Sequence, residues 1–240
     1  MRYAIGDIHG GNQTFQALLN RISLKHGDRL FLLGDYVDRG PDSLGVLKAI
    51  CRLQDAGYDV RPIRGNHDEM LLRTILGDHD LFSSEYFDGW GKVAFQDIWG
   101  NLTDADIFAQ IIASGRCSFP EDCLKLLQGM PYVLEEPDYV FVHAGFNMFT
   151  DDPIHESDYI EMLWNRHSFA DSSKLKGRLL VTGHVIRPLD VIKESLRTDL
   201  IRLDNGAFTA NFPDMGNLVA LNLDTKELTI QPWMDGDSIY

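Results

Sequence analysis

The chain has 240 residues, 44% of them hydrophobic, and a formal net charge of −14 at pH 7. Length and composition are typical of one globular domain, which we predict over residues 1–240. The negative charge argues against binding to nucleic acid or anionic membranes, which relies on clustered Lys and Arg. No apolar run reaches membrane-spanning length and the first predicted strand begins at Arg2, so we expect no signal peptide, no membrane contact and a cytoplasmic location.

Five short aliphatic or β-branched runs predict buried strands, and each run is followed by Gly, Asp, Asn or His. The runs are residues 2–5, 30–33, 60–63, 139–142 and 179–182. Amphipathic helices are predicted between the first three strands, at residues 14–25 and 43–56. This alternation is typical of a right-handed parallel sheet, whose ligands gather outside the carboxyl ends of the strands. We therefore expect the loops after the strands to meet at one edge.

Residues 77–138 have the least regular pattern of the chain. Apolar spacing predicts helices at 104–113 and 121–128, and we expect a helical cap over one side of a cleft. The segment is rich in aromatic residues, which we assign mainly to the core of that cap, although one or two could face a substrate: Phe82, Tyr86, Phe87, Trp90, Phe95 and Trp99. Beyond it, alternation over residues 217–233 predicts an antiparallel hairpin that completes a second sheet.

Glycine-flanked motifs with acids and histidines follow the predicted strands. They are GDIHG at 6–10, GDYVDRG at 34–40, GNHD at 65–68, and the later histidines of VFVHAG and LLVTGH. One such motif alone is typical of a turn. Together they supply six oxygen and nitrogen donors without a thiolate, a set that suits two divalent ions such as Mn, Fe, Zn or Mg: Asp7, His9, Asp35, Asn66, His143 and His184.

The order of these motifs resembles the phosphoprotein phosphatase family of calcineurin-like metallophosphatases, with GDxHG, GDxxDRG, GNH plus an acid, and two separated histidines. The resemblance runs from Gly6 to His184 and implies an α/β (α+β) fold of two packed mixed β-sheets flanked by helices. It implies two divalent ions, with Mn²⁺ expected and Fe, Zn or Mg as alternatives. It assigns Asp7 and His9 to the first ion, Asp35 to both, and the remaining donors to the second: Asn66, His143 and His184.

The same resemblance implies the catalytic residues. His67 would be the catalytic histidine, oriented by Asp38, and Arg39 would bind substrate phosphate. The segment MLWNRHSF is similar to a stretch of bacterial and phage members that carries a second phosphate-binding arginine, here Arg166. The segment IRLDNGAF resembles their closing strand and glycine turn, which indicates the bacterial or phage-type serine/threonine branch. Asp68 stands where Glu is usual in the family.

The resemblance implies hydrolysis of phosphomonoesters by direct attack of a hydroxide bound to both metals. A serine/threonine phosphoprotein, or a small phosphorylated molecule, is the expected substrate. The first alternative is a dinucleoside polyphosphate hydrolase of the diadenosine tetraphosphate type. Asp38 and His67 favour the monoesterase because an alkoxide leaving group needs a proton, although an anhydride hydrolase could retain both. A non-catalytic phospho-partner scaffold, the remote alternative, would have no use for a positioned acid. The oligomeric state is not predicted.

The remaining charged and thiol side chains receive structural interpretations. For Arg64 we predict an ion pair with a nearby carboxylate. Four histidines in polar surroundings are predicted to lie at the surface, although His167 could line the cleft because it neighbours Arg166: His26, His79, His155 and His167. Three cysteines without metal-ligand spacing are predicted to be reduced and mostly buried: Cys51, Cys117 and Cys123.

Overall fold

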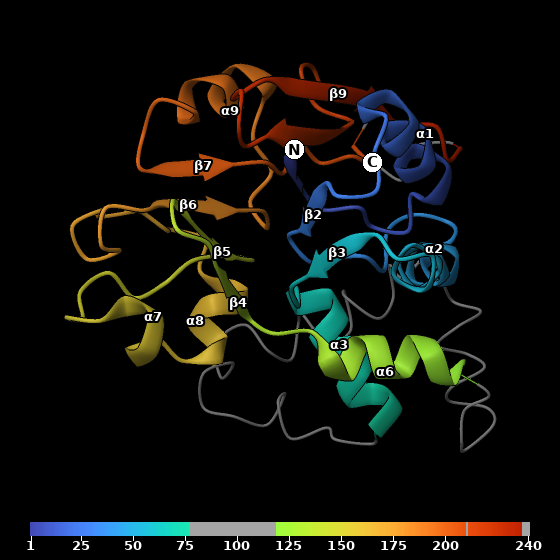
Figure 1. Ribbon diagram of the computed structural model, residues 1–240, viewed down its shortest axis with the longest axis horizontal. Helices are drawn as coiled ribbons and strands as arrows, with labels where there is room; N and C mark the ends of the chain where they lie inside the picture. The colour runs from blue at the N-terminus through green and yellow to red at the C-terminus, as the bar shows by residue number, and fades with distance from the viewer. Residues whose placement is uncertain (77–118, 210, 237–240) are drawn as a thin grey trace.

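The computed structural model describes residues 1–76, 119–209 and 211–236, and its centre is a five-stranded sheet in the order β3-β2-β1-β8-β9 (Figure 1). Strands β1 (Arg2–Ile5), β2 (Arg29–Leu32) and β3 (Asp59–Pro62) are parallel. Helices α1 (Asn12–Ile22) and α2 (Ser43–Asp55) connect them. The predicted β-α-β-α-β order is confirmed, with small shifts at the element ends.

The second sheet has four strands in the order β4-β5-β6-β7. Strand β4 (Val133–Glu135) is antiparallel to β5 (Tyr139–Val142), whereas β6 (Leu179–Thr182) and β7 (Leu200–Arg202) continue in parallel. Short helices connect these strands: α7 (Pro153–Glu156), α8 (Tyr159–Trp164) and α9 (Leu189–Ser195). The five predicted strands are therefore divided between two sheets, so the ligand loops after β1, β2 and β3 face those after β5 and β6.

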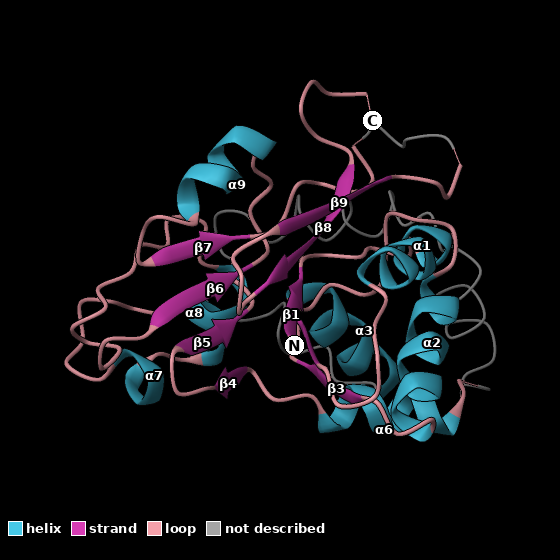
Figure 2. Cartoon of the chain, turned by 45° about the horizontal axis from the view of Figure 1, so that its top comes forward, coloured by secondary structure: helices cyan, strands magenta, loops and turns pink. Residues whose placement is uncertain are grey.

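The two sheets pack face to face, and helices cover the outer faces (Figures 1 and 2). Phe31 on β2 stacks on Phe141 on β5 in the layer between the sheets, with ring centroids 4.3 Å apart. The neighbouring residues on β2, Leu30 and Leu32, point to the other face and pack against α1 and α2. This alternation follows from the two-residue period of a strand. It confirms the predicted fold of two mixed β-sheets flanked by helices.

The predicted C-terminal hairpin forms, but it belongs to the first sheet and not to the second. Strand β8 (Asn217–Asn222) pairs with β1, and β9 (Leu228–Pro232) pairs with β8. Val219 and Leu221 turn inward to the layer between the sheets, beside Ala4 of β1. Both sheets contribute to this layer. The alternation of apolar residues in the hairpin therefore fits either sheet and could not indicate which sheet it would join.

Part of the predicted cap segment lies in the body of the fold. Helix α6 (Glu121–Gly129) packs against α2 and against α3 (Asn66–Leu76), with Cys123 and Leu127 in the core that the helices share with the first sheet. Residues 130–138 lead into β4 and the start of β5. The cap aromatics, the helix at 104–113, His79 and Cys117 lie outside the described residues, so the cap stays a prediction. Among the described helices, none is both long and apolar enough to cross a bilayer.

Candidate active site

The loops that carry the predicted ligands have unusual backbone conformations. His9, Asp35, Asp38, Arg39 and His184 have φ values of 47°, 53°, 69°, 73° and 66°. A residue other than glycine with a positive φ costs about 1–3 kcal/mol, and this conformation persists only where the surrounding structure fixes it. The strain is concentrated at the strand ends where the chemistry was predicted.

Glycines let these loops approach one another closely. A Cβ atom on Gly34 would lie 2.6 Å from Cα of Gly65, and one on Gly65 would collide with Oδ1 of Asp35. A Cβ on Gly183 would likewise collide with Oδ1 of Asp7. These motif glycines therefore leave room for the carboxylates of Asp7 and Asp35 at the centre of the site.

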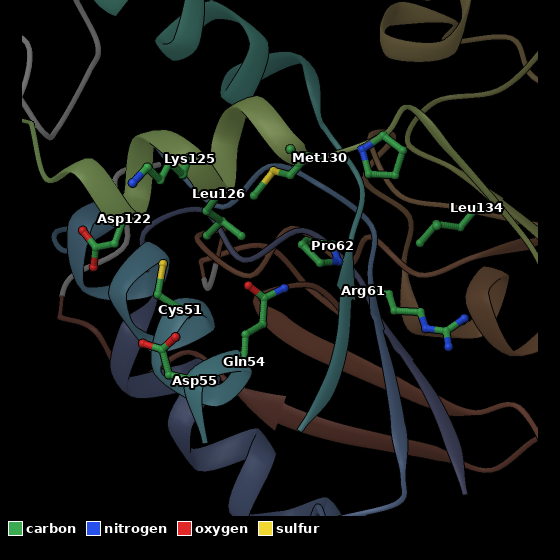
Figure 3. Close-up of a pocket in the computed structure, with 12 residues that line it drawn as sticks. Cys51, Gln54, Asp55, Arg61, Pro62, Asp122, Lys125, Leu126, Met130 and Leu134 are labelled. Atoms are coloured by element: carbon green, nitrogen blue, oxygen red, sulfur yellow. The ribbon is translucent and has the colours of Figure 1, made fainter. Parts of the chain in front are cut away.

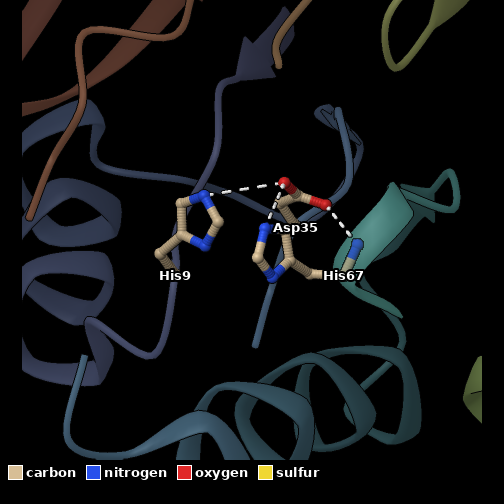
Figure 4. Close-up of side chains that lie close together, drawn as sticks. All are labelled: His9, Asp35 and His67. Atoms are coloured by element: carbon tan, nitrogen blue, oxygen red, sulfur yellow. Dashed lines mark hydrogen bonds and ion pairs between the residues drawn. The ribbon is translucent and has the colours of Figure 1, made fainter. Parts of the chain in front are cut away.

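Asp35 lies where two groups of side chains that could hold a metal ion meet. Its Oδ2 is 3.5 Å from Nε2 of His9, and its Oδ1 is 3.4 Å from Nε2 of His143 (Figure 4 shows His9 and Asp35). Oδ1 of Asn66 lies 2.9 Å from Nε2 of His143 and 3.1 Å from Nδ1 of His184. The structure thus brings these predicted ligands together, with Asp35 as the member common to both groups.

Backbone carbonyl groups orient two of the imidazole rings. Nδ1 of His9 lies 3.0 Å from the carbonyl oxygen of Val37, and Nδ1 of His143 lies 2.8 Å from that of Leu33. A carbonyl oxygen only accepts hydrogen bonds, so Nδ1 of each ring carries a hydrogen, and Nε2 is the ring nitrogen that faces Asp35. This is the arrangement in which a histidine binds a cation.

Asp7 and His184 each leave a buried polar atom without a hydrogen bond from the described residues. Oδ2 of Asp7 accepts a hydrogen bond from the backbone N–H of His184 at 2.9 Å, while Oδ1 of Asp7 and Nε2 of His184 have no such partner. A buried polar atom without a partner costs about 1–3 kcal/mol. A cation beside Asp7 would remove that cost for its carboxylate, so the donor set fits a pair of divalent metal ions.

Burial and charge set the ionisation of the centre. Burial raises the pKa of Asp7 well above its usual value and lowers the pKa of His9 to about 3. Burial also acts to raise the pKa of Asp35, but positive charge on His143 and His67 outweighs it and holds this pKa well below the usual value. Asp35 is therefore ionised and His9 neutral, which are the forms that bind cations.

His67 is held by two aspartates at the beginning of α3. Its Nδ1 lies 2.6 Å from Oδ2 of Asp38. Its backbone N–H donates to Oδ1 of Asp35 at 3.0 Å, and its Nε2 lies 4.0 Å from Oδ2 of Asp35 (Figure 4). Burial lowers the pKa of His67, but the charge of Asp35 and the hydrogen bond to Asp38 outweigh it, so the pKa is raised overall. The predicted pairing of His67 with Asp38 is present in the geometry.

Asp68 joins the loops after β2 and β3. Its Oδ2 accepts from the backbone N–H groups of Asp35 at 2.7 Å and Gly65 at 2.9 Å, and its Oδ1 accepts from that of Tyr36 at 3.0 Å. Burial raises the pKa of this carboxyl to about 7. The shorter Asp, in place of the Glu usual in the family, still reaches the backbone that positions Asp35.

A hollow of about 400 Å³ opens onto this centre, and it has seven of the ten predicted site residues in its wall. They are His9, Asp35, Arg39, Asn66, His67, Arg166 and His184. The other three, Asp7, Asp38 and His143, lie buried behind it and hydrogen-bond to members of the wall. The two arginines therefore face the same space as the candidate metal ligands.

Five further wall residues were not predicted as site residues: Val185, Ile186, Asp204, Phe208 and Thr209. Asp204 is buried and accepts from the backbone N–H of Gly206 at 2.7 Å, and burial raises its pKa to about 6. The ring of Phe208 lies 4.9 Å from that of His9 and 5.6 Å from the guanidinium carbon of Arg39. The signal that could have revealed Asp204 is its position just after β7, the same position relative to a strand as that of the predicted ligands.

The structural interpretations of other side chains are confirmed where the structure describes them. Arg64 forms an ion pair with Glu69 at 2.7 Å and does not line the hollow. His26, His155 and His167 are exposed, and Cys51 and Cys123 are buried free thiols.

A second hollow of about 530 Å³ lies between α2, β3 and α6 (Figure 3). Cys51, Gln54 and Asp55 of α2 line it from one side, and Asp122 and Leu126 of α6 line it from another. None of the predicted site residues contributes to its wall. It is therefore separate from the candidate active site.

Comparison with known proteins agrees with this geometry. The sequence matches the family model described as calcineurin-like phosphoesterase over residues 3–190. It is 35% identical over 144 residues to a symmetrical bis(5'-nucleosyl)-tetraphosphatase from Chromobacterium violaceum, and the match covers 60% of this chain and 42% of that protein. The chain thus spans less than half the length of this curated relative.

Solved structures share the fold at low sequence identity. One, described as a candidate diadenosine tetraphosphatase, has a TM-score of 0.66 and 22% identity, covering 98% of this chain and 94% of the other. A cold-active protein-tyrosine phosphatase from a Shewanella species has a TM-score of 0.61 and 14% identity, covering 96% and 80%. These likenesses show the fold alone. With a family match over most of its length, the chain belongs to the calcineurin-like phosphoesterase family.

Proposed function

We propose that the protein hydrolyses dinucleoside tetraphosphates of the diadenosine tetraphosphate type, with symmetrical cleavage into two nucleoside diphosphates. The observation that carries a phosphate-cleaving function is the hollow in which Arg39 and Arg166 face the ligand cluster around Asp35. The substrate class rests on the relatives, which are named symmetrical bis(5'-nucleosyl)-tetraphosphatases. This choice reverses the preference for a protein phosphatase that the sequence motifs favoured.

The donors divide into two sets around Asp35. One divalent ion would be held by Asp7, His9 and Asp35. The other would be held by Asp35 together with Asn66 at the start of α3, His143 after β5 and His184 after β6. We propose Mn²⁺ as the metal, with Fe, Zn or Mg as alternatives, because oxygen and imidazole donors suit all four. When bound, such ions supply positive charge to the phosphate and make water acidic enough to ionise near neutral pH.

Arg39 and Arg166 would bind the phosphate oxygens. The guanidinium group is planar and permanently charged, so it can donate two parallel hydrogen bonds to a phosphate. Arg39 follows Asp38 directly and Arg166 follows α8, so the two approach the hollow from different sheets. A chain of phosphates would therefore be held from both sides.

His67 would protonate the oxygen that leaves phosphorus. Asp38 accepts the hydrogen of Nδ1, which leaves Nε2 as the ring nitrogen that can carry a transferable proton. In the proposed reaction this oxygen belongs to a nucleoside diphosphate, which leaves readily and depends less on the acid than an alkoxide does. The fully formed His67–Asp38 pair is the observation that keeps a serine/threonine phosphatase as the second candidate function.

Steady-state kinetics on matched substrates tests the choice. The purified chain in Mn²⁺ is assayed on diadenosine tetraphosphate, a phosphoserine peptide and a small aryl phosphate. We expect the highest kcat/KM for the tetraphosphate. A higher kcat/KM for the phosphopeptide would establish the second candidate instead, and no turnover of any of the three would support the scaffold alternative.

A further inference from the structure

Phe149 and Phe169 form an exposed aromatic pair on the surface. Their side chains belong to residues that are 86% and 45% exposed, and their rings lie 5.5 Å apart at an angle of 66°. Nineteen residues lie between them in the sequence, so the fold brings the two rings together and leaves them exposed to solvent. Exposed apolar side chains that are scattered singly are ordinary, whereas contiguous ones can mark a binding site.

Both phenylalanines lie on loops that start at the candidate active site. Phe169 is three residues after Arg166, a stretch that spans at most about 11 Å, and Phe149 is six residues after His143. The two loops touch near the site, because a Cβ on Gly145 would lie 2.6 Å from Cβ of Ser168. The aromatic pair therefore lies on two loops that run from His143 and Arg166 and touch at Gly145 and Ser168.

Hydrogen bonds fix the loop that carries Phe149. Asn147 accepts from the backbone N–H of Phe149 at 3.1 Å through its Oδ1, and its own N–H donates to Ser157 at 2.8 Å. Nζ of Lys174 donates to the carbonyl oxygens of Met148 at 2.9 Å and Thr150 at 2.8 Å. The backbone on each side of Phe149 is thus held in place, so ordering this ring on a ligand costs little entropy.

We propose that Phe149 and Phe169 form a stacking platform for the nucleobase of the substrate, an inference that rests on the proposed function. A dinucleoside polyphosphate carries a phosphate chain and a flat base in one molecule. Arg166 is placed for the phosphates, and Phe169, three residues along the same loop, is placed for the base. Stacking on an aromatic ring needs no particular base, because every base has a π-face. The platform would therefore favour dinucleoside polyphosphates over simple phosphate esters without selecting one base.

Kinetics and binding of alanine variants test the platform. Phe149→Ala, Phe169→Ala and the double variant are compared with Met234→Ala, which truncates another exposed apolar side chain. We expect the double variant to raise KM for diadenosine tetraphosphate about 5- to 150-fold, from the usual loss on removing base stacking, with kcat unchanged. Phe149→Trp should retain the wild-type KM. The inhibition constant of inorganic tetraphosphate, which has the charges but no base, should stay unchanged in all variants.

A binding measurement separates failure of the platform from failure of the proposed function. Calorimetry in Mn²⁺ compares ADP with inorganic pyrophosphate, and the wild type should bind ADP more tightly, an advantage that the double variant loses. An unchanged KM and an unchanged ADP preference in the double variant would overturn the platform while leaving tetraphosphate hydrolysis intact. If the wild type cleaves only the phosphopeptide and the variants weaken that substrate alone, the pair is a peptide-binding surface and both proposals fail.

Discussion

Nδ1 of His67 lies 2.6 Å from Oδ2 of Asp38, and His67 belongs to the same pocket wall as Arg39 and Arg166. A carboxylate only accepts, so the hydrogen lies on Nδ1 and the position of the ring is fixed by Asp38. The charge of this aspartate also supports a protonated ring, and the pKa of His67 is raised despite burial. The pair is arranged for an acid that donates from Nε2.

His67→Asn should slow substrates in proportion to how much their leaving group needs a proton. General acid catalysis contributes about 10²- to 10⁴-fold, so we expect a loss in this range for phosphoserine peptide. The loss should be smaller for diadenosine tetraphosphate and smallest for aryl phosphates with acidic phenols. Asp38→Asn should show the same order with smaller losses. Equal slowing of every substrate, with metals still bound, would mean that His67 positions the phosphate or the nucleophile.

Removal of metal should abolish activity, and Mn²⁺ should restore it, because the oxygen and imidazole donors of the site converge as ligands of divalent ions that make water acidic. Asp35→Asn should reduce metal content more than His9→Ala does, since Asp35 belongs to both ligand groups and His9 to one. Elemental analysis of the dialysed proteins gives the stoichiometry. Fewer than one equivalent of metal in a fully active sample would contradict the two-metal account.

Arg166→Ala should weaken substrate binding and inhibition by free phosphate while metal content stays unchanged. Loss of a charge-assisted hydrogen-bonded pair to phosphate costs about 1.5–3 kcal/mol. Arg52→Ala, which removes an exposed arginine of α2, is the matched control. If phosphate inhibition is the same in Arg166→Ala as in the control, Arg166 has a structural role only.

Arg2 should stabilise the fold in a pH-dependent way. Its guanidinium on β1 lies 2.6 Å from Asp138 in the β4–β5 turn and 2.8 Å from Asp224 in the β8–β9 turn. Hydrogen bonds from Arg2 lower the pKa of Asp138 below its usual 3.8. Burial acts to raise the pKa of Asp224, but hydrogen bonds from Arg2 outweigh it, so this pKa is also lowered. Because these pKa values are lower in the folded state than in the unfolded chain, the stabilisation by Arg2 is complete at a pH above the unfolded-state pKa. It is lost as the pH falls through the folded-state pKa.

Thermal unfolding of Arg2→Gln checks this expectation. The Tm of the variant should lie below the wild-type Tm at pH 7, and the difference should shrink as the pH falls below 3.8 and the two carboxyl groups take up protons. Arg52→Gln should show no such pH-dependent difference. A Tm difference for Arg2→Gln that is constant with pH would indicate lost packing of the side chain.

The local pattern of the sequence predicted the strands and the ligand loops, because each buried run ends in a motif that only a turn or a binding site requires. It could not predict how strands pair over long distances. In the structure β3 and β5 belong to different sheets, and β8 pairs with β1. Both arrangements depend on which strand edges pair, and the sequences of these edges look alike. Asp204 was missed because a single Asp-Asn-Gly is typical of a turn. The motifs are shared by esterases and anhydrases, so the substrate class needed the relatives.

The products of diadenosine tetraphosphate hydrolysis test the central claim most directly. The wild-type chain in Mn²⁺ is incubated with this substrate in ¹⁸O-labelled water, and the nucleotides are separated by anion exchange and weighed by mass spectrometry. Our account predicts ADP as the only nucleotide product, with one ¹⁸O atom in one of the two ADP molecules formed per cleavage. Formation of ATP and AMP would contradict symmetrical cleavage, and an intact tetraphosphate under conditions in which a phosphoserine peptide is turned over would contradict the proposed substrate class.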